Sequence, residues 1–213
     1  MIHRLADTGI LVELDDLTSV LRLDAAVRTA REQGDAEFAD LVDVLPASRT
    51  LMLTTPPGYD LARLTRAVEA LDVDALAGDI GAGDETVVEV PVVYDGPDLA
   101  EVATITGLST AEVVQAHTGT PWRAAFGGFA PGFFYLVDGD PRLEVPRRSE
   151  PRTAVPDGAV ALAGTFSAVY PRTSPGGWQL IGHTPEQMWD SHRTPPALLS
   201  PGVLVRFVEV SAA

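Results

Sequence analysis

Apolar residues at helical spacing mark two segments in the first third of the chain. Residues 17–32 repeat apolar positions every three or four residues, and Gly34, a residue that favours a helix end, follows them. Residues 61–71 show the same spacing behind Asp60, whose carboxylate is expected to cap the helix. Both patterns predict amphipathic helices that bury one face in a core.

Short β-rich apolar runs surround these two helices. They occupy residues 10–14, 41–45, 50–54 and 86–94, with a loop of small residues at 78–83. The resulting order, β-α-β-β-α-β, is that of a split βαβ or ferredoxin-like unit. The sequence therefore predicts a small α/β lobe over residues 1–93.

The pattern changes in the second half of the chain. Residues 98–106 predict a short helix, and Ser109 with Glu112 forms a capping box that opens another helix, ending near His117. From residue 123 to 210, short apolar or aromatic runs are separated by Pro and Gly, which is typical of a β-barrel or sandwich. We therefore expect an α+β protein whose second domain spans residues 94–213.

Composition narrows the classes of function. The net charge is −15, and all 15 basic residues are arginines, so the chain has neither a Schiff-base lysine nor a P-loop lysine. This acidity argues against nucleic acid as a partner. There are no cysteines, and the four histidines lack zinc-site spacing, so no metal is predicted. Without a signal-peptide pattern or a membrane-length apolar run, a cytoplasmic location is expected.

Two segments combine glycine and proline with large aromatic residues. They are residues 127–136 and 174–182, which contain too many glycines for a core strand and too many aromatics for a linker. The glycine pairs at 127–128 and 176–177 either cradle an anion with backbone N–H groups or turn the chain at barrel corners. The candidate substrate-binding residues of these loops are Gly128, Phe129, Pro131, Gly132, Gly176 and Gly177.

Three arginines lie between the two loops in sequence. Arg147, Arg148 and Arg152 suit a carboxylate, carbamate or phosphate, because guanidinium groups bind such anions with paired hydrogen bonds. The alternative is a set of surface salt bridges to Glu144, Glu150 or Asp157. We assign Arg147 to substrate binding and Arg152 to the catalytic set.

His117 and Gln179 complete the predicted catalytic set. His117 closes a short helix before the first loop, where it either complements the helix dipole or acts as a general acid/base. Gln179 lies in an apolar strand, where its amide contacts either a substrate amide or a backbone group.

Three motifs carry a family resemblance: residues 128–136, the arginine segment 146–158 and residues 174–184. Together they closely resemble the family that contains the B-type subunit of 5-oxoprolinase, allophanate hydrolase subunit 1 and the Kip-type kinase inhibitors. The resemblance implies an N-terminal α/β lobe followed by a cyclophilin-like β-barrel. It also implies a subunit of an ATP-dependent 5-oxoprolinase, which opens the lactam of 5-oxoproline to glutamate.

The resemblance further implies partners. These are a second allophanate-hydrolase-type subunit (the C-type subunit of 5-oxoprolinase) and a third, TIM-barrel-like subunit, with ATP shared with or bound by them. Two alternatives remain open: the carboxyltransferase half of a urea-carboxylase or allophanate-type system, and a non-enzymatic histidine-kinase inhibitor.

One strand departs from the family pattern. Relatives usually have Gly-x-Gln-Thr-Gly-Ile-Tyr-Pro where this chain has Phe166 in place of Gln and Ala168 in place of Gly, within residues 164–171. If that strand lines the pocket, the pocket loses an amide and gains bulk, which puts the identity of the substrate in question.

Overall fold

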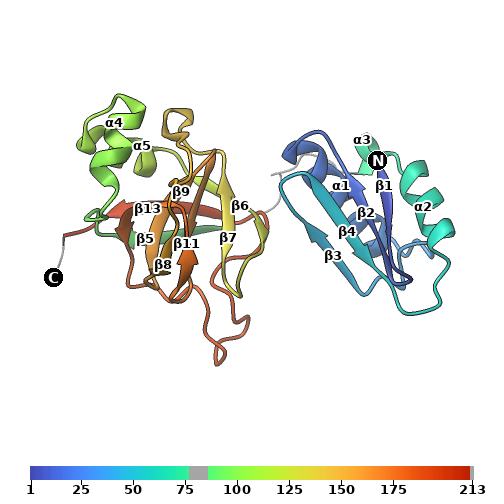
Figure 1. The fold of residues 1–213 in the computed structure, drawn as a ribbon. Helices are drawn as coiled ribbons and strands as arrows, with labels where there is room; N and C mark the ends of the chain where they lie inside the picture. Colours follow the sequence, from blue (N-terminus) through green and yellow to red (C-terminus); the bar gives the residue numbers. More distant parts are fainter. Residues whose placement is uncertain (77–85, 212–213) are drawn as a thin grey trace. The chain divides into compact units, whose positions relative to one another are not determined.

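The chain divides into two compact units, Met1–Asp84 and Glu85–Ala213. The computed structural model describes residues 1–76 and 86–211 (Figure 1). The predicted loop at 78–83 lies outside the described residues. None of the helices in these two ranges is long and apolar enough to cross a membrane.

The N-terminal unit is one antiparallel sheet packed against helices (Figure 1). The strands lie in the order β1-β2-β4-β3, and the helical faces predicted from periodicity supply Val20, Leu23, Leu64 and Val68 to a shared core. The elements are β1 (Ile2–Leu5), β2 (Gly9–Glu13), α1 (Leu17–Glu32), β3 (Asp43–Pro46), β4 (Thr50–Thr54), α2 (Leu61–Ala70) and α3 (Val73–Leu76).

Local signals set the ends of both long helices. An Asp60 carboxylate oxygen accepts hydrogen bonds from the backbone N–H groups of Ala62 and Arg63, at 3.0 and 3.1 Å, so the predicted cap is confirmed. Gly34 adopts φ +81° just after α1, as a helix-ending glycine does. Helix caps can be predicted from the sequence because the capping side chain and the N–H groups that it accepts from are two or three residues apart.

The predicted β-α-β-β-α-β order is wrong at its last strand. β5 (Val87–Val92) belongs to the C-terminal unit, where it pairs in parallel with β13 (Leu204–Glu209). The free edge of β2 is instead paired by β1, an element that the apolar pattern did not predict. An alternating Val-rich run predicts that a strand forms but not which distant strand it pairs with. The predicted domain boundary therefore lies after β5, at residue 93, whereas the two units of the structure divide before β5, between Asp84 and Glu85.

The C-terminal unit is a sheet that closes on itself. Its strands lie in the order β12-β9-β10-β7-β6-β13-β5, and paired backbone hydrogen bonds between Val93 and His183 join the two outer strands. The expected barrel is thus confirmed, while its cyclophilin-like character stays a prediction. The remaining strands are β6 (Trp122–Gly127), β7 (Phe134–Val137), β8 (Arg152–Val155), β9 (Ala159–Ala163), β10 (Phe166–Val169), β11 (Ser174–Gly176) and β12 (Gln179–His183).

Helices close one end of this barrel. α4 (Leu99–Thr106) and α5 (Thr110–Gly119) lie together over it (Figure 1), near the short 3₁₀ turn η1 (Pro141–Leu143). Both halves of the predicted Ser109–Glu112 capping box form at the start of α5. Val102 and Val113 point from these helices into the barrel core.

Strand β9 is buried on both faces. Val160 and Leu162 belong to the barrel core, whereas Ala159, Ala161 and Ala163 belong to a second, outer core. Small side chains on the outer face let large aromatic residues pack close to the sheet. This outer aromatic layer contains the candidate site.

Candidate functional site

Aromatic side chains and one arginine enclose a cavity of about 110 Å³ on the outer face of the barrel. We call it the aromatic pocket. It is lined by Phe129, Phe133, Tyr135, Arg147, Tyr170, Pro175, Gly176, Gly177 and Trp178. Both glycine–aromatic segments and the arginine segment therefore meet at one place, which the sequence did not show.

Edge-to-face aromatic contacts build the walls of the pocket. The Phe133 ring centroid lies 5.4 Å from that of Tyr170 and 5.6 Å from that of Trp178. Tyr135 lies 5.7 Å from Trp178. These geometries are favoured by the ring quadrupoles, so the walls are held in place before any ligand binds.

Phe129 forms the outer wall. The loop that contains Phe129 is tight, with the Gly128 N–H donating to the Phe133 carbonyl at 3.1 Å, and Phe129 itself adopts φ +67°. This left-handed backbone places a ring that is 59% exposed over Phe133 and Tyr170. A large apolar side chain held exposed in an uncommon conformation points to a binding role.

Arg147 supplies the only positive charge among the lining residues. Its guanidinium carbon lies 5.9 Å from the Trp178 ring centroid, within the range of a cation–π contact. Within the described residues it forms no ion pair, unlike its neighbours Arg148 and Arg152. Arg147 is therefore the arginine that remains available to an anionic group.

Arg148 and Arg152 both pair with a carboxylate of this chain. Arg148 Nη1 and Arg152 Nη2 donate to Asp98 Oδ1 at 2.8 and 2.7 Å, and Asp98 Oδ2 accepts from the Leu180 N–H at 2.7 Å. Arg152 thus pairs through Nη2 with a buried carboxylate of this chain, while its buried Nη1 has no hydrogen-bond partner in the described residues, so its place in the catalytic set stays a prediction. The alternative partners Glu144, Glu150 and Asp157 are likewise not the acceptors in these ion pairs.

Asp98 is the residue of this region that sequence motifs did not indicate. Burial raises the pKa of its carboxyl group, but the hydrogen bonds from Arg152 and Leu180 and the two positive charges outweigh burial and lower the pKa. Asp98 lies 50 and 54 residues from its arginine partners, so no pattern of neighbouring residues predicted this ion-pair cluster.

His117 does not line the aromatic pocket. It is fully buried in the barrel, with Nδ1 2.7 Å from the Tyr94 hydroxyl, Nε2 2.8 Å from the Ser167 hydroxyl and its ring stacked on Phe207 at 4.2 Å. Burial lowers its pKa from 6.5 to about 3. The general acid/base prediction is wrong for this pocket, since a buried neutral imidazole cannot exchange a proton with a ligand there.

Gln179 is also not among the residues that line the aromatic pocket. It is 4% exposed, and its Nε2 donates to the Pro146 carbonyl at 3.2 Å. The backbone contact is therefore observed, while the buried Oε1 atom has no hydrogen-bond partner in the described residues, so a contact with a substrate amide stays a prediction. Gln179 thus fixes the chain just before Arg147.

The remaining loop residues shape the wall without lining it. Gly132 adopts φ +81°, and a Cβ there would lie 2.8 Å from the Trp189 Cβ atom. Gly128 and Pro131 are exposed and lie outside the lining set. Tyr170, Phe133 and Tyr135 were not predicted; Phe133 lies just before β7 and Tyr135 lies on it.

Phe166 and Ala168 lie behind the pocket. The Phe166 ring is 5.4 Å from that of Tyr135, which lines the pocket, and Ala168 is fully buried in the outer core. Neither residue lines the pocket, and Phe166 contacts it only through the ring of Tyr135.

Comparisons with known proteins agree with this architecture. The family described as "Carboxyltransferase domain, subdomain C and D" matches residues 1–199. The B-type subunit of 5-oxoprolinase from Escherichia coli O157:H7 is 37% identical over 211 residues, which cover 97% of this chain and 94% of that protein.

Solved structures show the same fold. The crystal structure of TTHA0988 superposes with a TM-score of 0.76 at 36% identity, covering 100% of this chain and 41% of that one. The Kluyveromyces lactis urea amidolyase superposes with a TM-score of 0.77 at 18% identity, covering 99% of this chain and 15% of that one, a likeness of fold alone. This chain thus spans about two fifths of TTHA0988.

Proposed function

The chain belongs to the family of 5-oxoprolinase B-type subunits, built on the carboxyltransferase subdomain C and D fold, and from this we propose that it is a subunit of an ATP-dependent 5-oxoprolinase. We further propose that the aromatic pocket binds 5-oxoproline. The enzyme opens the lactam ring to give glutamate, and this chain binds and orients the substrate.

The observation that carries this proposal is Arg147, an arginine without an ion-pair partner in the described chain, at an aromatic pocket. 5-Oxoproline is a small ring with one carboxylate. The carboxylate pairs with the guanidinium group, and the ring packs against aromatic faces such as Trp178. A cavity of about 110 Å³ suits a ligand of this size rather than a larger one.

The pocket does not supply a general base. Its ionisable side chains are one arginine and two tyrosines, residue types whose ordinary pKa values lie at about 10 or above. Burial raises the pKa of Tyr170 further. The groups that transfer protons therefore come from partner subunits, which we propose to be a C-type subunit of 5-oxoprolinase and a TIM-barrel-like chain.

Neither the aromatic pocket nor the groove beside α5 fits ATP. The aromatic pocket is too small for a nucleotide, and the larger groove beside α5 is lined by one carboxylate and by no basic residue among the described ones. The chain also has no lysine. We propose that the partner subunits bind ATP and that the complex works in the cytoplasm.

Substitution of Arg147 tests the proposal. In the complex co-expressed with its partner subunits, Arg147→Gln is expected to raise the KM for 5-oxoproline about tenfold, because a charge-assisted hydrogen bond is lost. The measurement is 5-oxoproline-dependent ATP hydrolysis. Arg206→Gln is the matched control, since Arg206 is an exposed arginine on β13 that pairs with Glu89.

Two results contradict the proposal. If the complete wild-type complex shows no 5-oxoproline-dependent ATP hydrolysis, the proposed function is wrong. If the complex is active but Arg147→Gln leaves the KM unchanged, only the assignment of the pocket is wrong.

A carboxyltransferase half-site is the second candidate. The fold shared with urea amidolyase favours it, and a carbamate has the charge and planarity that Arg147 recognises. An assay of the assembled complex separates the two candidate functions. Transfer of a carboxyl group from a biotinylated carrier to urea would support the carboxyltransferase function.

A further inference from the structure

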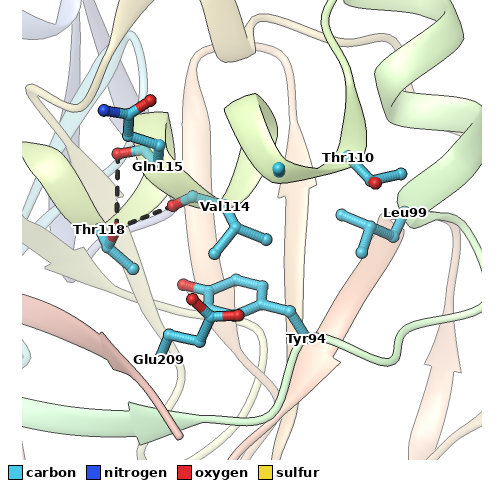
Figure 2. A pocket seen from close by; sticks show the side chains of 8 residues that line it. Tyr94, Leu99, Thr110, Val114, Gln115, Thr118 and Glu209 are labelled. Carbon is cyan, nitrogen blue, oxygen red and sulfur yellow. Dashed lines mark hydrogen bonds between the residues drawn. The ribbon is translucent and has the colours of Figure 1, made fainter.

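A groove of about 480 Å³ lies between α5 and the ends of β5 and β13, apart from the aromatic pocket (Figure 2). We call it the α5 groove. It is lined by Tyr94, Leu99, Thr110, Ala111, Val114, Gln115, Thr118 and Glu209, all within the C-terminal unit. The proposed reaction uses none of these residues.

The floor of the groove is fixed by hydrogen bonds inside the fold. The Tyr94 hydroxyl is 2.7 Å from Nδ1 of the buried His117, which holds the phenol ring in one orientation. The Thr118 hydroxyl donates to the Val114 carbonyl at 2.9 Å, so it is turned back onto its own helix. The polar groups left for a ligand are the Thr110 hydroxyl, the Gln115 amide and the Glu209 carboxylate.

Glu209 makes the α5 groove electronegative. Within the described residues its carboxylate forms no ion pair, and no basic side chain lines the groove. Figure 2 shows the carboxylate beside the Tyr94 ring, and its charge adds to burial in raising the pKa of the Tyr94 hydroxyl. The groove therefore repels anions such as 5-oxoproline and attracts cations.

The surfaces around Glu209 suit a cation with a short apolar stem. An aromatic face next to a carboxylate stabilises an ammonium group through cation–π and ionic attraction together. Leu99, Ala111 and Val114 offer an apolar wall for the carbon chain. We infer that the α5 groove is a second binding site of this protein, selective for small organic cations such as a primary alkylammonium.

Titration of the full-length chain with n-butylammonium tests this inference. Backbone amide NMR shifts are expected to change and saturate on α5 and at the end of β13, and n-butyrate, an anion of similar size, is expected to cause no such change. Glu209→Gln is expected to weaken binding about fivefold, because one exposed ion pair is lost. Glu89→Gln is the matched control, since Glu89 is an exposed glutamate that pairs with Arg206 instead.

Filling the groove gives an independent test. Ala111 is exposed and lines the groove, so Ala111→Trp is expected to abolish the saturable shifts while the rest of the spectrum keeps its folded dispersion. Ala100→Trp, at an alanine of α4 outside the groove, is expected to bind as the wild type does. The inference is overturned if n-butylammonium gives no saturable shifts, if n-butyrate acts equally, or if Glu209→Gln or Ala111→Trp binds like the wild type.

Discussion

At the scale of single residues, Gly176 lies where the wall of the aromatic pocket passes closest to Tyr170. A Cβ at Gly176 would clash with the Tyr170 hydroxyl oxygen, and Tyr170 is only 1% exposed, so its ring could yield only by moving into the aromatic pocket that it lines. Gly176→Ala is expected to destabilise the protein by about 1–3 kcal/mol and to raise the KM for 5-oxoproline. Urea unfolding and the activity of the complex measure the two effects.

Gly177 provides the matched control for Gly176. The nearest atom to a Cβ at Gly177 is the Pro151 Cβ at 3.5 Å, an ordinary van der Waals contact, and neither glycine has a positive φ. Gly177→Ala is therefore expected to behave like the wild type. If Gly176→Ala and Gly177→Ala have equal effects, the close approach to Tyr170 is not the reason that position 176 requires glycine.

His117 couples stability to pH. Its pKa is 6.5 in an ordinary setting and about 3 in the fold, so the unfolded chain binds the proton more tightly. The contribution of neutral His117 is fully present above about pH 6.5 and is lost as the pH falls towards about 3. Between about pH 7 and about pH 5, we expect a loss of about 2 kcal/mol in the free energy of unfolding.

The variant His117→Gln isolates this effect. Glutamine does not titrate, so the difference in unfolding free energy between wild type and variant is expected to shrink as the pH falls. The two proteins would be compared by urea unfolding at each pH. Parallel pH profiles would show that His117 is not the group responsible.

At the scale of elements, Asp98 connects three parts of the C-terminal unit. It lies just before α4, pairs with Arg148 and with Arg152 on β8, and accepts the N–H of Leu180 on β12. The Arg148 N–H in turn donates to the Gly177 carbonyl at 2.8 Å. The backbone that carries Arg147 is thereby held against the wall of the aromatic pocket.

Removal of the Asp98 charge is expected to loosen this arrangement. Asp98→Asn is expected to cost about 2–4 kcal/mol in the free energy of unfolding, because the partly buried Arg148 and Arg152 lose their carboxylate acceptor. Asp95→Asn is the control, since Asp95 is an exposed aspartate nearby that pairs with His183. A loss no larger for Asp98→Asn than for Asp95→Asn in urea unfolding would refute the role.

At the scale of the whole molecule, each unit has its own hydrophobic core. The core of the N-terminal unit runs from Ile10 to Val68, and both cores of the C-terminal unit lie between Val90 and Phe207. Since no core cluster of the described residues combines both units, we expect residues 1–84 and 85–213 to fold as separate fragments. Dispersed NMR spectra and cooperative thermal unfolding of each fragment would confirm this, and an unfolded fragment would contradict it.

The sequence by itself determined the local structure of this protein. Amphipathic spacing located α1 and α2, Asp60 and the Ser109–Glu112 box marked helix starts, and frequent turns indicated a β-barrel or sandwich. These signals depend on residues that are only a few positions apart, so they can be recognised in the sequence alone. The glycine–aromatic motifs also predicted two of the loops that line the aromatic pocket, which contain Phe129, Gly176 and Gly177.

Only the tertiary structure decided which residues meet. It assigned β5 to the barrel, buried His117 between Tyr94 and Ser167, and placed Arg147 rather than Arg152 at the aromatic pocket. Each outcome depends on contacts between residues far apart in sequence, such as the 50 positions from His117 to Ser167. Local propensity cannot choose among distant partners, because burial and charge pairing are set by the whole fold.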